Sequence, residues 1–253
     1  MRLQAQSVAG FALTDDTDKG IKPMKFAKIA LVAAAATVAL SGAAMADELK
    51  LSYNVGIASD YVFRGVSNTQ EDPQIFGGID ASYGIGYAGV WASNVDFGTD
   101  DPSAEIDLYA GVKPTLGDTS LDLGVIYYGY VDDKGATPGQ YGYLELKAAA
   151  SRAVGKATVG VAAYYSPEFP FESGNAFYYE VNGSLPVAEK LSVSAALGHQ
   201  EIKHAGDYNT WNIGATYALT EKLAADLRYS DTDEHGYGAI YGDRITVSLK
   251  AAF

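Results

Sequence analysis

Opposite charges stand two or four residues apart at three places where polar and apolar residues alternate along the chain. The pairs are Asp60 with Arg64, Glu145 with Lys147, and Asp226 with Arg228. Side chains at even spacing share one face of a β-strand, so both members of each pair would meet the same environment. Such residues could form a constriction that selects solutes by charge. Alternatively the partners only neutralise one another where they are partly buried, and the sequence leaves both readings open.

Further charged residues share the same polar face of the alternating segments. With the three pairs they make up the candidate site: Lys50, Asp60, Arg64, Asp80, Glu105, Asp107, Glu145, Lys147, Glu180, Asp226 and Arg228. Opposite signs recur on this face, which favours a network across an enclosed lumen over a filter of one sign. Bulky residues such as Tyr128, Tyr164 and Tyr178 follow the same parity, and they would narrow any passage through the lumen.

The connections between the alternating segments are strongly acidic. The longer ones hold 14 acidic and two basic residues, so they carry −12 of the net charge of −15 on residues 47–253. Candidates for an acidic mouth are Asp100, Asp101, Asp132 and Asp133. A ring of one sign concentrates counter-ions within about 8–10 Å at physiological salt. We therefore expect a preference for cations, with divalent cations bridging to lipopolysaccharide, although a merely solvated surface would carry similar charges.

Catalytic and metal-binding motifs find little support. The chain has no Cys and only His199, His204 and His235, which excludes disulfides and Cys-based metal sites. Asp231, Asp233 and His235 share one connection, but they would hold a metal or relay a proton only if other connections converged on them. A formal net charge of −13 argues against a nucleic-acid partner. We predict no enzymatic activity, no metal site and no cofactor.

The elements that must position these side chains show a period of two. In the first segment Leu51, Val55 and Ile57 share one parity, whereas Lys50 and Ser52 share the other. This alternation predicts β-strands with one apolar face and one polar face. The twelve predicted segments are roughly 49–64, 74–84, 86–97, 104–114, 120–131, 140–151, 156–166, 176–186, 190–200, 208–219, 222–230 and 245–253.

Short and long connections alternate between these segments. The long ones lie near 65–72, 98–103, 132–139, 167–175, 201–207 and 231–243. Six long and five short connections place both termini at the end with the short turns. An even strand count of about ten residues each predicts an all-β, transmembrane, antiparallel up-and-down β-barrel of about twelve strands with both termini periplasmic. A lipid-exposed sheet must close, because an open edge leaves backbone groups unpaired in hydrocarbon.

A soluble barrel or sandwich with the apolar face inward is the alternative, and three features favour lipid. The apolar faces run for about ten residues, which suits the thickness of a bilayer. The chain ends on Phe253, like the assembly signal of outer-membrane barrels. Aromatic residues recur near segment ends, as expected of interfacial girdles: Tyr53, Tyr61, Tyr83, Tyr87, Trp91, Trp211, Tyr217 and Tyr229.

An export signal precedes the barrel. Lys25 and Lys28 come before an apolar run of 12 residues, 29–40, and the small residues Ala44 and Ala46 flank a cleavage site. We assign residues 24–46 to a signal peptide, 47–253 to the barrel, and 1–23 to an upstream extension from a start codon placed too early. Export through such a signal predicts the outer membrane of a Gram-negative bacterium.

Three motifs carry a family resemblance: 53–65 (YNVGIASDYVFRG), 89–98 (GVWASNVDFG) and 105–111 (EIDLYAG). They resemble the TorF family of porin-like proteins, also called the Gcw_chp family, and the similarity extends over most of residues 47–253. The resemblance implies a proteobacterial outer-membrane pore. It supplies no established functional residues.

Together these features predict a narrow, cation-preferring, porin-like channel for the passive diffusion of small hydrophilic solutes. The alternative is a closed structural or adhesive barrel that acts through its acidic extracellular loops. Expected partners are outer-membrane lipid and lipopolysaccharide, the barrel-assembly machinery through the strand ending at Phe253, and small solutes.

Overall fold

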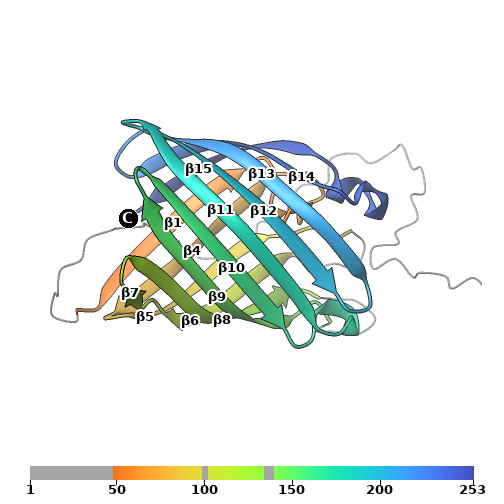
Figure 1. Cartoon of the computed structure of the whole chain (residues 1–253). Helices are drawn as coiled ribbons and strands as arrows, with labels where there is room; N and C mark the ends of the chain where they lie inside the picture. The colour runs from red at the N-terminus through yellow and green to blue at the C-terminus, as the bar shows by residue number, and fades with distance from the viewer. Residues whose placement is uncertain (1–47, 99–101, 134–139) are drawn as a thin grey trace, which may run out of the picture.

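The structure, a computed structural model, describes residues 48–98, 102–133 and 140–253. The predicted extension, the predicted signal peptide and two mouth candidates, Asp100 and Asp101, lie outside these residues. Twelve long antiparallel strands form one sheet (Figure 1). They are β1 (Lys50–Ala58), β4 (Gln74–Tyr83), β5 (Gly86–Asn94), β6 (Ala104–Val112), β8 (Thr119–Val131), β9 (Tyr143–Val154), β10 (Ala157–Ser166), β11 (Ala176–Ala188), β12 (Leu191–Ile202), β13 (Gly206–Ala218), β14 (Leu223–Thr232) and β15 (Arg244–Ala252).

The sheet closes on itself. Each long strand pairs with the next along the chain, and β15 pairs with β1 from Asn54 opposite Ala252 to Ala58 opposite Ser248. The backbone of Phe253 extends the seam, since its N–H donates to the Tyr53 carbonyl at 2.8 Å. Closure leaves no open sheet edge, which is the requirement for a sheet in contact with lipid. The predicted twelve-stranded antiparallel barrel is confirmed.

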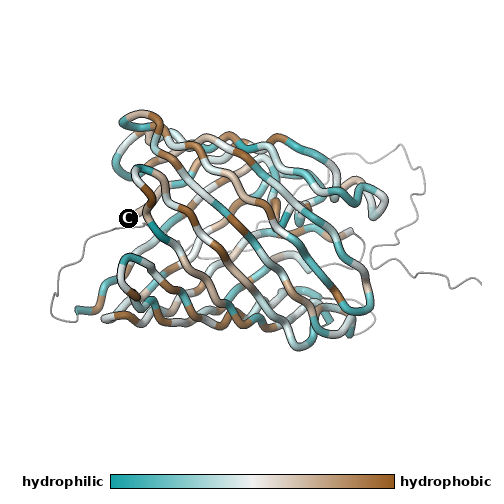
Figure 2. The backbone as a smooth tube through the Cα atoms, viewed as in Figure 1, coloured by the Kyte–Doolittle hydropathy of each residue, from teal (hydrophilic) through white to brown (hydrophobic). Residues whose placement is uncertain are grey.

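The barrel is apolar outside and polar inside. Leu108 is 54% exposed and Val247 52%, whereas Glu105 and Glu145 are each 1% exposed. Hydrophobic and hydrophilic residues accordingly alternate along each strand (Figure 2). This arrangement contradicts the soluble alternative, which needs the apolar face inward. Within the described residues, no helix is long and apolar enough to span a bilayer.

Most predicted segment bounds differ from the structure by one to three residues, and two differences change a connection. The first strand ends at Ala58 instead of residue 64, and the chain then forms a hairpin of β2 (Val62–Phe63) and β3 (Val66–Ser67). The connection predicted over 201–207 is a three-residue turn, because β12 and β13 pair as far as Ile202 opposite Gly206. Alternation alone could not reveal either change, because in both cases the chain keeps the period of two through the residues concerned.

Of the remaining connections, the short turns lie at one end of the barrel and the long loops lie at the other (Figure 1). The described start of β1 and the C-terminal residue Phe253 lie at the end with the short turns, one of which contains β7 (Thr115–Leu116). At the other end, short 3-10 helices occupy the long loops: η1 (Pro170–Glu172), η2 (His235–Tyr237) and η3 (Ala239–Tyr241).

Candidate functional site

The β2–β3 hairpin folds into the lumen and carries Arg64 at its tip. Phe63 pairs with Val66, which leaves Arg64 and Gly65 as a two-residue turn with φ angles of 49° and 84°. Positive φ at both positions is the requirement of a type I′ turn. A non-glycine residue pays about 1–2 kcal/mol for that conformation. A Cβ atom at residue 65 would collide with Thr210 of β13, so the turn lies directly against the barrel wall.

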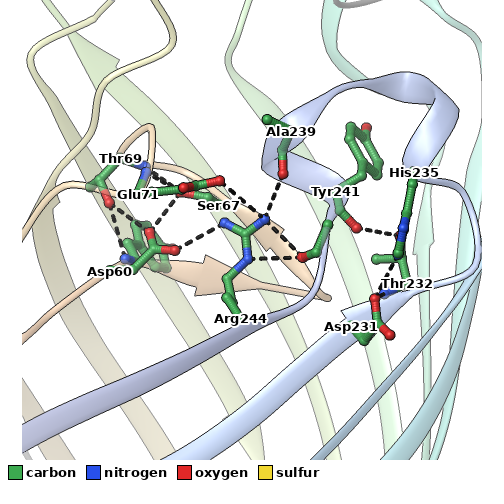
Figure 3. A network of polar contacts seen from close by, with 12 residues as sticks. Asp60, Ser67, Thr69, Glu71, Asp231, Thr232, His235, Ala239, Tyr241 and Arg244 are labelled. Carbon is green, nitrogen blue, oxygen red and sulfur yellow. Dashed lines mark hydrogen bonds and ion pairs between the residues drawn. The ribbon is translucent and has the colours of Figure 1, made fainter.

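A polar network fixes the base of the hairpin at Asp60 (Figure 3). The hydroxyls of Ser67 and Thr69 donate to Asp60 Oδ1 at 2.6 and 2.9 Å. Arg244 of β15 donates to Asp60 Oδ2 at 3.0 Å and also to the Ala239 carbonyl, again at 3.0 Å. These bonds tie the hairpin to the last strand and to η3. Burial of this network makes the base of the hairpin part of the barrel interior.

Arg64 lies in a pocket that we call the Arg64 cage. Its walls are Phe63, Glu145, Gln200, Tyr164 and Tyr178. The guanidinium donates to both Glu145 oxygens at 2.8 and 2.7 Å and to Gln200 Oε1 at 3.0 Å. Its carbon lies 4.7, 4.9 and 4.3 Å from the ring centroids of Phe63, Tyr164 and Tyr178. The side chains of Arg64 and Glu145 are 6% and 2% exposed, so this ion pair is fully enclosed.

The predicted pairing of Asp60 with Arg64 is therefore wrong. Both residues lie beyond the end of β1, and each finds its partner on another part of the barrel. Asp60 pairs with Arg244, whereas Arg64 pairs with Glu145. The physical reason is the inward turn after Ala58, which removes the common strand face that the prediction assumed.

The other two predicted pairs have different outcomes. Asp226 and Arg228 do form an ion pair at 3.1 Å. Glu145 and Lys147 do not, because Lys147 reaches Asp122 of the neighbouring strand β8 at 2.7 Å. The residue opposite Lys147 on β8 is Gly124, and Asp122 lies two residues before it on the same face of that strand. Asp122 is a lumenal residue that the sequence reasoning did not include among the candidates.

Two further acidic candidates, Glu105 and Asp107, are buried in β6. Glu105 accepts a hydrogen bond from the Tyr61 hydroxyl at 2.6 Å. Asp107 is 8% exposed, and its Oδ1 atom has no hydrogen-bond partner in the described protein.

The remaining lumenal candidates lie along the wall. Glu180 accepts hydrogen bonds from Tyr178 and Asn182 at 2.9 and 2.8 Å. Asp80 accepts one from the Tyr109 hydroxyl at 2.6 Å. Lys50 is exposed at the start of β1. The lumenal candidates in the strands other than Lys50 and Asp107 therefore have polar partners, which for Glu180 lie on its own strand β11 and for the others elsewhere in the barrel.

Tyr61, Tyr87 and Trp91, predicted for the interfacial girdles, point inward. Tyr87 donates to Asp122 at 2.6 Å, and the Trp91 ring packs against Tyr61 with centroids 5.4 Å apart. A Cβ atom at Gly124 would collide with the Tyr87 hydroxyl oxygen, so glycine there leaves room for that hydroxyl against the wall. The sequence signal for this is that Gly89, Gly111 and Gly124 share the inward parity of their strands, where a glycine leaves room for a neighbouring ring or hydroxyl.

A cavity of about 490 Å³ remains beside the hairpin. Six of the residues that line it are Phe76, Trp91, Tyr164, Tyr178, Asp226 and Arg228, and Arg64 also borders it. Aromatic rings and paired charges therefore line this cavity together.

The acidic mouth is only partly described. Asp132 is exposed and accepts a hydrogen bond from the Ser103 hydroxyl at 3.1 Å, and Asp133 is half-buried. In the connection between β14 and β15, His235 contacts Asp231 at 2.8 Å, and this hydrogen bond raises the pKa of His235 above its usual 6.5. Asp233 instead accepts from Asn209 at 2.6 Å. Among the described residues, no group of His, Cys, Asp or Glu could hold a metal ion.

Several solved structures share this fold. They are the KdgM porin (8% identity, TM-score 0.56), the NanC porin (10%, 0.51) and an outer membrane channel from Pseudomonas putida (13%, 0.50). The matches cover 80%, 80% and 86% of this chain and 98% of each of those chains. At such identities the likeness shows the fold alone, a porin-like barrel of the kind found in Gram-negative outer membranes.

A search of curated protein sequences finds no match. A family model described as "Bacterial protein of unknown function (Gcw_chp)" does match, over residues 42–253. That range contains every described strand together with the hairpin, and the chain therefore belongs to the Gcw_chp family.

Proposed function

We propose that this chain is a narrow outer-membrane channel for the passive diffusion of small hydrophilic solutes, as the TorF resemblance also suggests. The observation that carries the proposal is the hairpin inside the lumen, held by the Arg64–Glu145 ion pair and bordered by a cavity of about 490 Å³. A twelve-stranded barrel lies between the filled eight-stranded and the open sixteen-stranded types. The inward hairpin narrows it further, so only small solutes would pass.

The barrel would lie in the outer membrane of a Gram-negative bacterium with its short turns and both termini on the periplasmic side. Long loops on the outer side and an apolar outer face support this orientation. Lipid and lipopolysaccharide would contact that face. The exposed aromatic end at Phe253, which closes the seam with Tyr53, would serve recognition by the assembly machinery.

Transport would be selective for cations without any catalytic step. The paired lumenal charges largely neutralise one another, so the acidic mouth would set the preference. Its field is screened by salt over about 8–10 Å under physiological conditions. The acidic mouth comprises Asp100, Asp101, Asp132 and Asp133.

Planar-bilayer recordings under a potassium chloride gradient test this proposal. We expect small, resolvable single-channel currents with a reversal potential on the cation-selective side. Neutralising the four mouth residues to Asn together should move the reversal potential toward zero, more at low than at high salt. Anion selectivity in the unaltered protein would contradict the cation preference.

A closed structural or adhesive barrel is the second candidate. The observation that favours it is the hairpin itself, since two buried ion pairs, Arg64–Glu145 and Asp60–Arg244, hold it in the lumen. A protein that inserts into bilayers but passes no current would support this reading. Its loops would then carry the function, and removing the mouth charges should weaken surface attachment.

A further inference from the structure

Four of the five residues that form the Arg64 cage belong to the barrel wall and not to the hairpin. Glu145, Tyr164, Tyr178 and Gln200 come from β9, β10, β11 and β12, four consecutive strands of the barrel. Only Phe63 belongs to the hairpin. The backbone pairing of these strands sets the backbone positions of the four wall residues, and none of the pairings involves the hairpin.

We propose that the cage also takes the guanidinium group of a solute, such as free arginine, in exchange for Arg64. The inference rests on the proposed function, because it assumes that solutes enter the lumen. It adds a ligand class and a site to that function.

The chemistry of the cage selects a planar, charged group. Glu145 accepts two parallel hydrogen bonds at 2.8 and 2.7 Å, the fork geometry that guanidinium presents. Two tyrosine rings of the wall stack within 5 Å of the guanidinium carbon. An ammonium group is a compact point charge without this fork or flat face, so lysine-like solutes should fit less well. Urea has the planar shape but lacks the charge.

The cavity beside the hairpin supplies the route to the cage. It is lined by Arg64, Tyr164 and Tyr178, so a solute there already touches part of the cage. Glu145 is covered by Arg64, which means that the solute must displace Arg64 before it binds. Displacement would release the hairpin tip from the wall. Binding of the solute would therefore be coupled to widening of the lumen.

Titration calorimetry with methylguanidinium as the probe tests the cage on the refolded protein. Arg64→Ala should bind one equivalent at least tenfold more tightly than the unaltered protein, in which Arg64 competes. Adding Glu145→Gln should abolish this binding. Adding Asp118→Asn should leave it intact, because Asp118 forms an ion pair of the same 2.7 Å length with Arg152 but lies exposed at the surface. Lack of binding to Arg64→Ala, or equal binding of urea, would overturn the proposal.

A second measurement serves if Arg64→Ala does not assemble into a barrel. Tyr61 at the hairpin base packs on Trp91, so displacement of the hairpin should change Trp91 emission in a Trp211→Phe background. Methylguanidinium should cause the change where sodium and urea do not, and Glu145→Gln should remove it. No change would overturn the proposal. Binding without any bilayer current would instead contradict the proposed channel function and leave the assignment of the cage standing.

Discussion

Removing Glu145 alone should destabilise the protein far more than removing an exposed acid with an equally short ion pair. Glu145→Ala would leave the Arg64 guanidinium buried at 6% exposure without its carboxylate. Breaking a buried pair in this way typically costs about 3–5 kcal/mol. Asp118→Ala breaks a 2.7 Å pair whose side chains are 80% and 55% exposed, and such surface pairs contribute about 0–1 kcal/mol.

The double variant Arg64→Met/Glu145→Met distinguishes the cost of leaving one buried charge unpaired from the cost of losing the ion pair itself. It removes both charges and leaves none unpaired, so it should cost less than Glu145→Ala despite the larger change. Urea titrations of folding into lipid vesicles would measure the free energy of unfolding for each variant. We expect a coupling energy of at least about 1 kcal/mol between the two positions. Additive effects, or equal costs for Glu145→Ala and Asp118→Ala, would refute an enclosed Arg64–Glu145 pair.

Three further predictions follow from the outer face, the lumen wall and the rim. Leu249→Arg places a charge against lipid and should cost about 2–4 kcal/mol in the same titrations, whereas Ser248→Arg should cost much less, and equal costs would reverse the assignment of faces. Gly124→Val should displace the Tyr87 hydroxyl that contacts residue 124, move this side chain toward the lumen and lower single-channel conductance, and unchanged conductance would contradict that packing. His235 should titrate above 6.5 by NMR and return toward 6.5 in Asp231→Asn. Because the folded-state pKa is raised, any stabilisation from this contact is present below pH 6.5 and lost as the pH rises through the raised value.

The strand count, the closure and the two faces of the barrel could be predicted because one physical rule determines them. A sheet with lipid on one side and a polar lumen on the other repeats every two residues, and that repeat is visible in segments such as 245–253. The hairpin could not be predicted in this way, because residues 59–64 continue the same alternation after the strand has ended. The Arg64–Gly65 turn between Phe63 and Val66 was the one local signal of it.

The partners of the lumenal charges were beyond sequence reasoning for a different reason. Arg64 meets Glu145 across 81 positions of sequence, and Asp60 meets Arg244 across 184. Local spacing favours neighbours on one strand, as it correctly did for Asp226 and Arg228. Once the chain leaves the strand and enters the lumen, the partner of a charged side chain depends on which strands lie opposite it across the barrel. No local sequence pattern encodes that arrangement.

Single-channel conductance of the unaltered protein and of Arg64→Ala, in matched planar bilayers, tests the central claim most directly. If the hairpin narrows a conducting lumen and Arg64 holds it there, the unaltered protein should give small currents and Arg64→Ala should give currents several-fold larger. Arg152→Ala, which removes an exposed arginine from an ion pair at the surface, should match the unaltered protein. Identical conductance of the unaltered protein and Arg64→Ala, or no current from either, would contradict the account.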